Sequence, residues 1–358
     1  MRNLRIGALV LMLITAVVAG CGGGSQPGTT MARPESSAAK ETAPAAAAPK
    51  ELTKLKLGVG GTKNSMIFLV PVFAQANKFF EEEGLDVEII EFQGGAQAAQ
   101  ALVSGDVDVA SMATDHAVKS KVQGVDVSMV ALHTRYPTVT LIVDSKLKDK
   151  VKTVKDLKGM KVGITSPGSG SHKALLSLLD KFGLKPTDVE IVGVGTSGMP
   201  AALESGKIQA AANYDPFVTQ VVSSGKAFVL WDLRTKKDTF ELYGGEYPFV
   251  SLVTRTESVD KKADTIQKVV RAIVKAQKFL TSNPAETITA KLPTEIKGSD
   301  EALYLAALRA NLEAITPDGQ ASDQGLQLVI NSLKADGVIP AASDVKPSAF
   351  WNGRFLGK

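Results

Sequence analysis

The chain is poor in several residue types that carry chemistry. Its 358 residues include one cysteine, three histidines and two tryptophans, and aromatic residues make up only 6%. A single cysteine excludes a disulfide framework within the chain. The three histidines, His116, His133 and His172, lack the spacing of a metal site. We therefore expect neither disulfide bonds nor a bound metal.

Excess charge of one sign is also scarce. The formal net charge is +4, and no block of lysine and arginine is interleaved with aromatic residues. A nucleic-acid partner is therefore not expected. Hydrophobic residues at 44% and charged residues at 22% are typical of a globular protein, and the length suggests about two domains.

The N-terminal segment carries the pattern of an exported lipoprotein. Arg2 and Arg5 precede an apolar run from Ile6 to Val18, which is shorter than the roughly 20 residues that span a bilayer. The following "VAGC" resembles the bacterial lipobox and ends at Cys21. We predict a signal peptide over 1–20 and a lipidated Cys21 that holds the protein on the outer face of the cell membrane or in the periplasm. The alternative is an unmodified thiol in a tail.

The next segment, 21–51, is rich in glycine, serine, proline and alanine and has no apolar period. Such a composition cannot bury a core, so we expect a disordered tether between the membrane and the folded part.

The folded part repeats itself. "ALVSGDVDVA" at 101–110 and "ALESGKIQAA" at 202–211 have the same order of helix end, glycine and strand, and 84–90 resembles 183–192. Two copies of a strand–helix–strand–helix–strand unit explain this order, although helix-capping glycines can also recur by local preference alone. A helix is expected over 66–84, ended by Gly84, and the segment 140–159 joins the two units. A helical tail is expected over 263–283, 300–315 and 323–337, with the middle helix capped by Ser299 or Asp300.

These patterns predict an α/β fold of two lobes with a cleft between them and a helical C-terminal tail. We expect a discontinuous first lobe formed by 52–143 and 248–358, and a second lobe formed by 144–247.

Small polar loops follow the predicted strands of both units. They lie at 60–65, 93–97, 112–115, 166–172 and 195–198. Ligands of open parallel sheets bind beyond the carboxyl ends of the strands, and helix N-termini there suit an anion or a polar group. Thr114 or Asp115 is the expected N-cap of the helix that follows the third strand. We therefore predict a small polar or anionic solute in the cleft.

Two catalytic interpretations of the sequence have less support than solute binding. "GVGTSG" at 193–198 matches a dinucleotide motif, with Asp215 about 20 residues farther on, but the following helix is short. Ser171 and His172 are adjacent, so on a helix they point about 100° apart and cannot act as nucleophile and base. No catalytic residue and no cofactor are expected.

The second unit resembles a known family. "TVKDLKGMKVGI", "TSPGSGSHKALLSLLDKFGLKPTDVEIVGVG" and "ALESGKIQAAANYDP" are similar to substrate-binding proteins of ABC importers for aliphatic sulfonates, nitrate, taurine and pyrimidine precursors. The resemblance covers roughly 52–280 and is strongest over 154–216. It implies a type II periplasmic-binding-protein fold without enzyme activity, acting as a monomer that delivers its ligand to an ABC permease. The cysteine-rich motif of a cytosolic relative that makes the thiamine pyrimidine is absent.

The resemblance also implies a ligand site in the strand-end loops. The residues that it places there are Asn64, Ser65, Gly95, Ala96, Gln97, Thr114, Asp115, Gly168, Ser169, Gly170, Ser171, His172, Tyr214 and Asp215. Among the aromatic residues Tyr214 is the best pocket candidate, whereas core packing is favoured for Tyr136, Trp231, Tyr243, Tyr247 and Phe249. An exported enzyme and a tethered ligand sensor remain as alternative functions.

Overall fold

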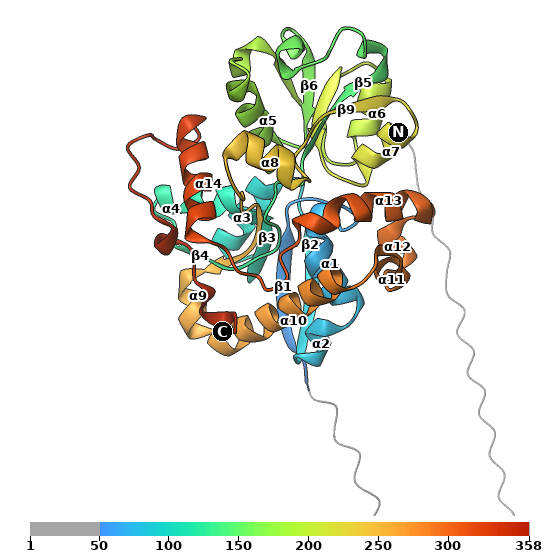
Figure 1. Cartoon of the computed structure of the whole chain (residues 1–358). Helices are drawn as coiled ribbons and strands as arrows, with labels where there is room; N and C mark the ends of the chain where they lie inside the picture. Colours follow the sequence, from blue (N-terminus) through green and yellow to red (C-terminus); the bar gives the residue numbers. More distant parts are fainter. Residues whose placement is uncertain (1–50, 358) are drawn as a thin grey trace, which may run out of the picture. The chain divides into compact units, whose positions relative to one another are not determined.

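Two five-stranded sheets organise residues 51–357, the part of the chain that the computed structural model describes (Figure 1). The predicted signal peptide, Cys21 and nearly all of the predicted tether lie outside these residues. We call each sheet with the helices packed on it a lobe. Buried aliphatic side chains such as Leu57 and Val162, both 0% exposed, fill the core of each lobe.

The first sheet has the strand order β2-β1-β3-β10-β4, with β10 antiparallel to its neighbours. Helices α1, α3 and α4 connect or follow its strands, and η1 and α2 complete the first connection. The elements are β1 (Thr53–Val59), η1 (Met66–Phe68), α1 (Leu69–Ala76), α2 (Phe79–Glu82), β2 (Leu85–Glu91), α3 (Gly95–Ser104), β3 (Val109–Ala113), α4 (Thr114–Val122), β4 (Val127–Leu132) and β10 (Val250–Arg255).

The second sheet repeats this topology in the order β7-β6-β8-β5-β9. Here β5 is the antiparallel strand between β8 and β9. The elements are β5 (Thr140–Asp144), β6 (Lys161–Ile164), α5 (Gly170–Lys181), β7 (Glu190–Gly193), α6 (Met199–Glu204), β8 (Ala210–Asn213), α7 (Phe217–Ser223), β9 (Ala227–Asp232) and α8 (Lys236–Tyr243).

The predicted internal repeat is confirmed by matching backbone hydrogen bonds. The amide of Val107 donates to the carbonyl of Ala101 at 3.2 Å, and the amide of Ile208 donates to Ala202 at 3.2 Å. Gly105 and Gly206 end α3 and α6 with φ of +89° and +71°, in the left-handed region that favours glycine. The two "ALxSG" segments are therefore equivalent helix ends that lead into β3 and β8.

Strands β4, β5 and β9 were not predicted as parts of the sheets. β4 and β9 fall in segments without strict alternation, and β5 lies in the stretch that we expected only to join the two units. Because Thr140–Asp144 pairs with β8 and β9, the second lobe begins before Thr140 rather than at the predicted 143/144 boundary.

Two chain segments connect the lobes side by side. The amide of Leu233 donates to the carbonyl of Val139 at 2.9 Å, and the amide of Phe249 donates to Thr134 at 2.9 Å. The chain thus leaves the first sheet and returns to it along one paired crossing.

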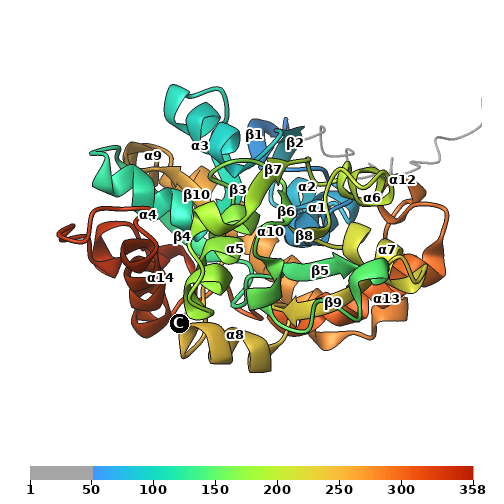
Figure 2. The same ribbon diagram turned by 90° about the horizontal axis from the view of Figure 1, so that it is seen from above.

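The C-terminal helices pack mainly on the first lobe. They follow α9 (Thr256–Lys261) and comprise α10 (Ala263–Ser282), α11 (Ala285–Ala290), α12 (Thr294–Lys297), α13 (Glu301–Asn311) and α14 (Asp323–Ala335). Figure 1 shows α10 beside α1 and α2, whereas α14 packs on α4, and Figure 2 shows α13 near α7 of the second lobe. The helical tail is confirmed, and Asp300 caps α13 by accepting from the amide of Leu303.

Two local predictions need correction. The expected helix over 66–84 is broken into η1, α1 and α2, because Lys78 adopts a left-handed conformation. Helix α4 begins at Thr114 with Ala113 as N-cap, so neither Thr114 nor Asp115 has the capping role. No helix in the described part of the chain has the length and apolar character needed to cross a membrane.

Candidate functional site between the lobes

The loop after β1 contacts the second lobe directly. The amide of Met66 and the hydroxyl of Ser65 both donate to the carbonyl of Asp215, at 2.8 and 3.4 Å. Ser65 is 1% exposed, and the neighbouring Asn64 keeps a buried Oδ1 without a hydrogen-bond partner. This loop therefore joins a strand end of one lobe to a strand end of the other.

The loop after β2 contributes less. Ala96 and Gln97 are exposed, and the Gln97 side chain accepts a hydrogen bond from the amide of Gln93 within the same loop. Gly95 lies against the ring of His116, where a Cβ atom would clash with Nε2. Gly95 also lies close to the loop after β1, because a Cβ on Gly60 would be 2.6 Å from the Gly95 Cα atom.

Helix α4 brings a carboxylate into the interior. Asp115 is 2% exposed, its Oδ1 accepts a hydrogen bond from the Tyr247 hydroxyl at 3.1 Å, and its Oδ2 has no partner. Thr114, one residue earlier, donates to the hydroxyl of Ser251 at 3.3 Å. Burial, reinforced by the charge of Lys119, holds the pKa of His116 well below its usual range, so this imidazole is neutral.

The hydroxyl groups of the loop after β6 form hydrogen bonds with one another. Thr165, Ser169 and Ser171 form a triangle of hydrogen bonds with oxygen–oxygen distances of 2.9–3.0 Å. Ser169 caps α5 by accepting from the amide of His172, whose Nδ1 accepts from the amide of Gly168 at 2.9 Å. The polar groups of these predicted residues hold the start of α5 in place.

The Asp215 carboxylate is fully engaged inside the protein. One oxygen accepts from Arg234 and from Asn311, both at 2.7 Å, and the other accepts from the hydroxyl of Thr219 at 2.6 Å. Arg234 and Asn311 are buried and come from different lobes. The sequence carries no signal for this network, because its members are far apart along the chain.

The strand ends of the two lobes meet around aromatic rings. A Cβ on Gly170 would lie 2.5 Å from Cζ of Phe249 and 3.0 Å from the hydroxyl of Tyr214. The rings of Tyr214 and Phe249 are 6.4 Å apart, and Phe249 lies 6.5 Å from Tyr247. The structure thus brings Asp115, Tyr214 and Gly170 into one interlobe cluster.

A buried ion pair that the sequence analysis missed lies beside this cluster. Lys173 of α5 pairs with Asp336, which follows α14, and both side chains are 4% exposed. Lys173 also donates to Ser177 at 2.6 Å and to Ser332 at 2.7 Å, and its Nζ lies 5.7 Å from the Tyr243 ring centre. Tyr243 in turn stacks on Tyr247 at 4.1 Å, so the ion pair and the aromatic rings form one continuous interface.

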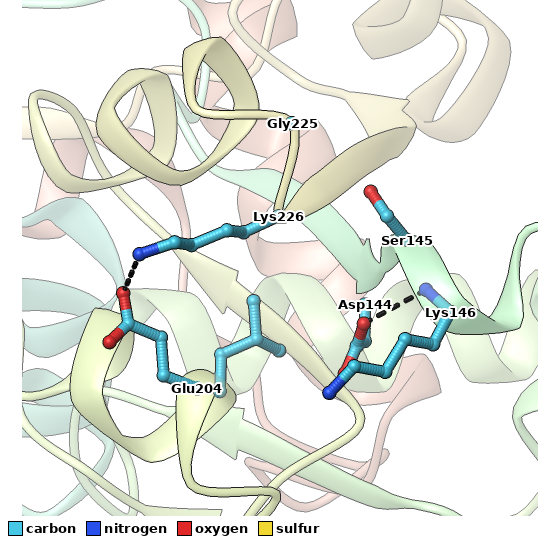
Figure 3. Close-up of a pocket in the computed structure, with 7 residues that line it drawn as sticks. Asp144, Ser145, Lys146, Glu204, Gly225 and Lys226 are labelled. Atoms are coloured by element: carbon cyan, nitrogen blue, oxygen red, sulfur yellow. Dashed lines mark hydrogen bonds and ion pairs between the residues drawn. The ribbon is translucent and has the colours of Figure 1, made fainter.

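Two cavities lie outside the cluster. One of about 590 Å³ spans the lobes between α7 and the segment joining α12 to α13, and Asn64 lines its edge. The other, of about 410 Å³, is lined by Asp144, Lys146 and the Glu204–Lys226 ion pair (Figure 3). The amide of Asp144 donates to the carbonyl of Gln209, which lies just before β8. This second cavity is therefore at the opposite end of β8 from Tyr214.

Comparisons with known proteins agree on one family. Residues 66–287 match the family model described as NMT1/THI5 like. The chain is 27% identical over 219 residues to a putative aliphatic sulfonates-binding protein of Escherichia coli K12, covering 61% of this chain and 65% of that protein. It is 26% identical to the taurine-binding periplasmic protein of the same strain, covering 59% of this chain and 63% of that one. The chain thus spans slightly less than two thirds of either relative.

Solved structures share the fold. A protein from Bordetella bronchiseptica RB50 is 35% identical with a TM-score of 0.79, and the match covers 85% of this chain and 96% of that one. The alkanesulfonate-binding protein of Xanthomonas axonopodis pv. citri, solved with MOPS bound, has a TM-score of 0.67 at 21% identity and covers 84% and 99% of the two chains. The predicted periplasmic-binding-protein fold is confirmed.

Proposed function

Because this chain belongs to the NMT1/THI5-like family, we propose that it is the solute-binding protein of an ABC importer. It captures a small polar or anionic organic solute of the sulfonate, nitrate, taurine or pyrimidine class between its lobes and delivers it to a permease. The relatives named above are described as binding proteins for sulfonates or taurine, and binding alone, without catalysis, is the function proposed here.

The meeting of the two sets of strand-end loops carries this proposal. Gly170 of the second lobe touches Phe249 of the first, and Asp115 and Tyr214 lie in the same cluster. A solute held there contacts both lobes only when they are closed, so binding stabilises the closed arrangement. The permease would then recognise the closed form.

The predicted ligand residues divide into three groups by their surroundings. We propose direct ligand contact for Asn64, Ser65, Thr114, Asp115, Gly170 and Tyr214, which are buried at the interface or line its edge. For Gly168, Ser169, Ser171, His172 and Asp215 the internal hydrogen bonds support a role in holding the loops. Gly95 supports the approach of His116, and the exposed Ala96 and Gln97 form the rim.

A thermal-shift screen tests the function. Purified protein is heated with alkanesulfonates, nitrate, taurine, pyrimidines and, as chemically unrelated controls, neutral sugars. A ligand at 100 times its dissociation constant raises the free energy of unfolding by about 2.7 kcal/mol, which gives a clear shift. Chemical conversion of a bound compound during the assay would instead favour an exported enzyme.

We further propose that Cys21 is acylated and anchors the protein outside the cytoplasm. Mass spectrometry of the membrane fraction should show the modified Cys21, and a Cys21→Ser variant should be released into the soluble fraction. Recovery of the wild-type protein in soluble, unmodified form would contradict the anchor.

A further inference from the structure

We propose that the ligand presents a nitrogen–hydrogen group to Asp115, either a protonated amine or an amino group on a flat heteroaromatic ring. This inference rests on the proposed function and narrows its ligand class. It excludes simple oxyanions that carry no hydrogen-bond donor.

The first observation is the unused oxygen of Asp115. The side chain is 2% exposed, and Tyr247 satisfies Oδ1 while Oδ2 has no partner. A buried carboxylate without a compensating partner is costly, and buried charges in proteins are normally paired. A donor on the ligand would supply the missing hydrogen bond.

The second observation is that the nearby lysines bond to groups other than Asp115. Lys119, on the same helix as Asp115, donates to the carbonyl of Gly168 at 3.1 Å. Lys173 of α5 pairs with Asp336, and within residues 51–357 no ion pair includes Asp115. His116 beside Asp115 is neutral because burial disfavours its charged form. Lys119 attracts Asp115 only through space, and within the described residues no cation pairs with the free Oδ2 of Asp115, which leaves this oxygen for a donor on the ligand.

The third observation is the aromatic wall around the carboxylate. Tyr247 and Phe249 approach from the first lobe and Tyr214 from the second, all three of them buried. Burial and, to a smaller extent, the charge of Asp115 raise the pKa of Tyr214 and of Tyr247, so both phenols remain neutral hydrogen-bond donors. Aromatic faces attract cationic groups and flat rings.

These features select against an anion without a donor. Nitrate or an alkanesulfonate would place negative charge beside Asp115, and the two charges would repel each other. A zwitterion such as taurine can direct its ammonium group to Asp115 and its sulfonate toward the N-termini of α3 or α5. An aminopyrimidine can direct its amino group to the same oxygen.

Isothermal titration of the purified full chain with matched probes tests the inference. Taurine is compared with ethanesulfonate, and 4-amino-2-methylpyrimidine with 2,4-dimethylpyrimidine, because each pair differs in the amino group. Nitrate serves as the simple anion. We expect the amino member of at least one pair to bind about 10- to 100-fold more tightly than its match, the range for a hydrogen bond to a charged group. The pair that responds distinguishes an alkylamine from an amino-heteroaromatic ligand.

The variant Asp115→Asn tests the residue, since it removes the charge and retains the size. The preference for the amino probe should fall by about 10-fold or more, while Asp149→Asn, at a fully exposed surface carboxylate, should leave it unchanged. Thermal unfolding of Asp115→Asn verifies that the variant is folded. If the variant does not fold, the inference is tested by whether the wild-type protein prefers the amino member of each pair.

Two results overturn the inference alone. One is that at least one probe binds but neither amino probe binds more tightly than its match and than nitrate, and the other is that folded Asp115→Asn retains the full preference for the amino probe. In both cases the proposed function stands. Binding of none of the five probes overturns the inference and counts against the proposed function as well.

Discussion

The contact between the lobes depends on a side chain that is missing at Gly170. Because a Cβ there would lie 2.5 Å from Phe249, we expect Gly170→Ala to strain the closed arrangement. Overpacking of this kind costs about 1–3 kcal/mol, which corresponds to ligand binding weakened by roughly 10- to 100-fold. Titration of the ligand found in the thermal-shift screen measures the effect.

A second substitution and a control sharpen this prediction. Phe249→Leu in the Gly170→Ala background should restore part of the affinity, because it removes the ring atoms that meet the new methyl group. Gly357→Ala should have no effect, since nothing lies within 4 Å of the added Cβ. Unchanged affinity in Gly170→Ala would show that the lobes need not approach this closely.

The buried His133 makes stability sensitive to acid. Burial lowers the pKa of His133 from 6.5 to about 3, so the unfolded chain binds a proton that the folded chain does not. Below pH 6.5 the free energy of unfolding should therefore fall by about 1.4 kcal/mol per pH unit on account of this group, down to about pH 3. Urea denaturation at pH 7, 6, 5 and 4 measures the slope.

Replacing this histidine should flatten that slope. His133→Gln keeps a side chain that can bond the Ser111 hydroxyl, 3.2 Å from Nδ1 in the wild type, but it does not titrate. The difference between the two slopes isolates His133 from the carboxylates and from His116. Parallel slopes would contradict its depressed pKa.

Single residues also mark how far the sequence could predict the site. The loops containing Ser65 and Asp115 were found because glycine and polar residues follow the strands, whereas Tyr214 was found through the family resemblance. The sequence could not show that the Asp215 carboxylate accepts hydrogen bonds from Arg234 and Asn311, because these partners come from distant segments. Which hydrogen bonds a side chain makes depends on the tertiary structure, so residue type alone does not predict them.

At the scale of secondary-structure elements, the two repeats provide an internal control. Gly105 and Gly206 occupy equivalent left-handed positions, and alanine in that conformation costs roughly 1–2 kcal/mol. Gly105→Ala and Gly206→Ala should each lower the free energy of unfolding by this amount, measured by urea denaturation. Because both glycines end helices away from the interlobe cluster, ligand affinity should change little.

Asparagine at the same positions separates conformation from packing. Gly105→Asn and Gly206→Asn should be milder than the alanine variants, because asparagine tolerates the left-handed region. No close neighbour would meet a Cβ at Gly206, and the Arg255 side chain lies 3.8 Å from one at Gly105. An effect confined to one repeat would contradict the equivalence.

The repeated elements were predictable because their signals are local. A helix end, a glycine and an alternating strand occupy ten residues, and the same order occurs twice. Strands β4, β5 and β9 were missed because their assignment depends on pairing with distant segments: β4 pairs with β10, and β5 pairs with β8 and β9. The break at Lys78 was missed because no glycine or proline marks it.

At the scale of the whole molecule, the Lys173–Asp336 pair links α5 of the second lobe to the end of α14. Both side chains are almost fully buried, so removing one partner leaves an unpaired charge. Lys173→Met and Asp336→Leu should each cost about 3–5 kcal/mol, whereas the double variant should cost much less than the sum. Chemical denaturation of all four proteins completes the double-mutant cycle.

The same cycle reports on lobe closure. Because the pair crosses between the lobes, both single variants should also weaken ligand binding, measured by titration under conditions where they remain folded. The exposed pair Lys261–Glu257 is the matched control, since it lies within one helix and should show little coupling. Additive costs for the buried pair would mean that the two charges do not act together.

The paired crossing between the lobes has a consequence for how this architecture can be rebuilt. Thr140 and Asp232 are register partners at one end of β5 and β9, so the second sheet begins and ends at neighbouring points. A segment whose two ends meet can be inserted or exchanged without rethreading the remaining chain. Grafting residues 140–232 from a relative would replace Gly170, Ser171 and Tyr214, whereas Asp115 and Phe249 would stay. Half of the proposed recognition surface could therefore be exchanged as one continuous segment.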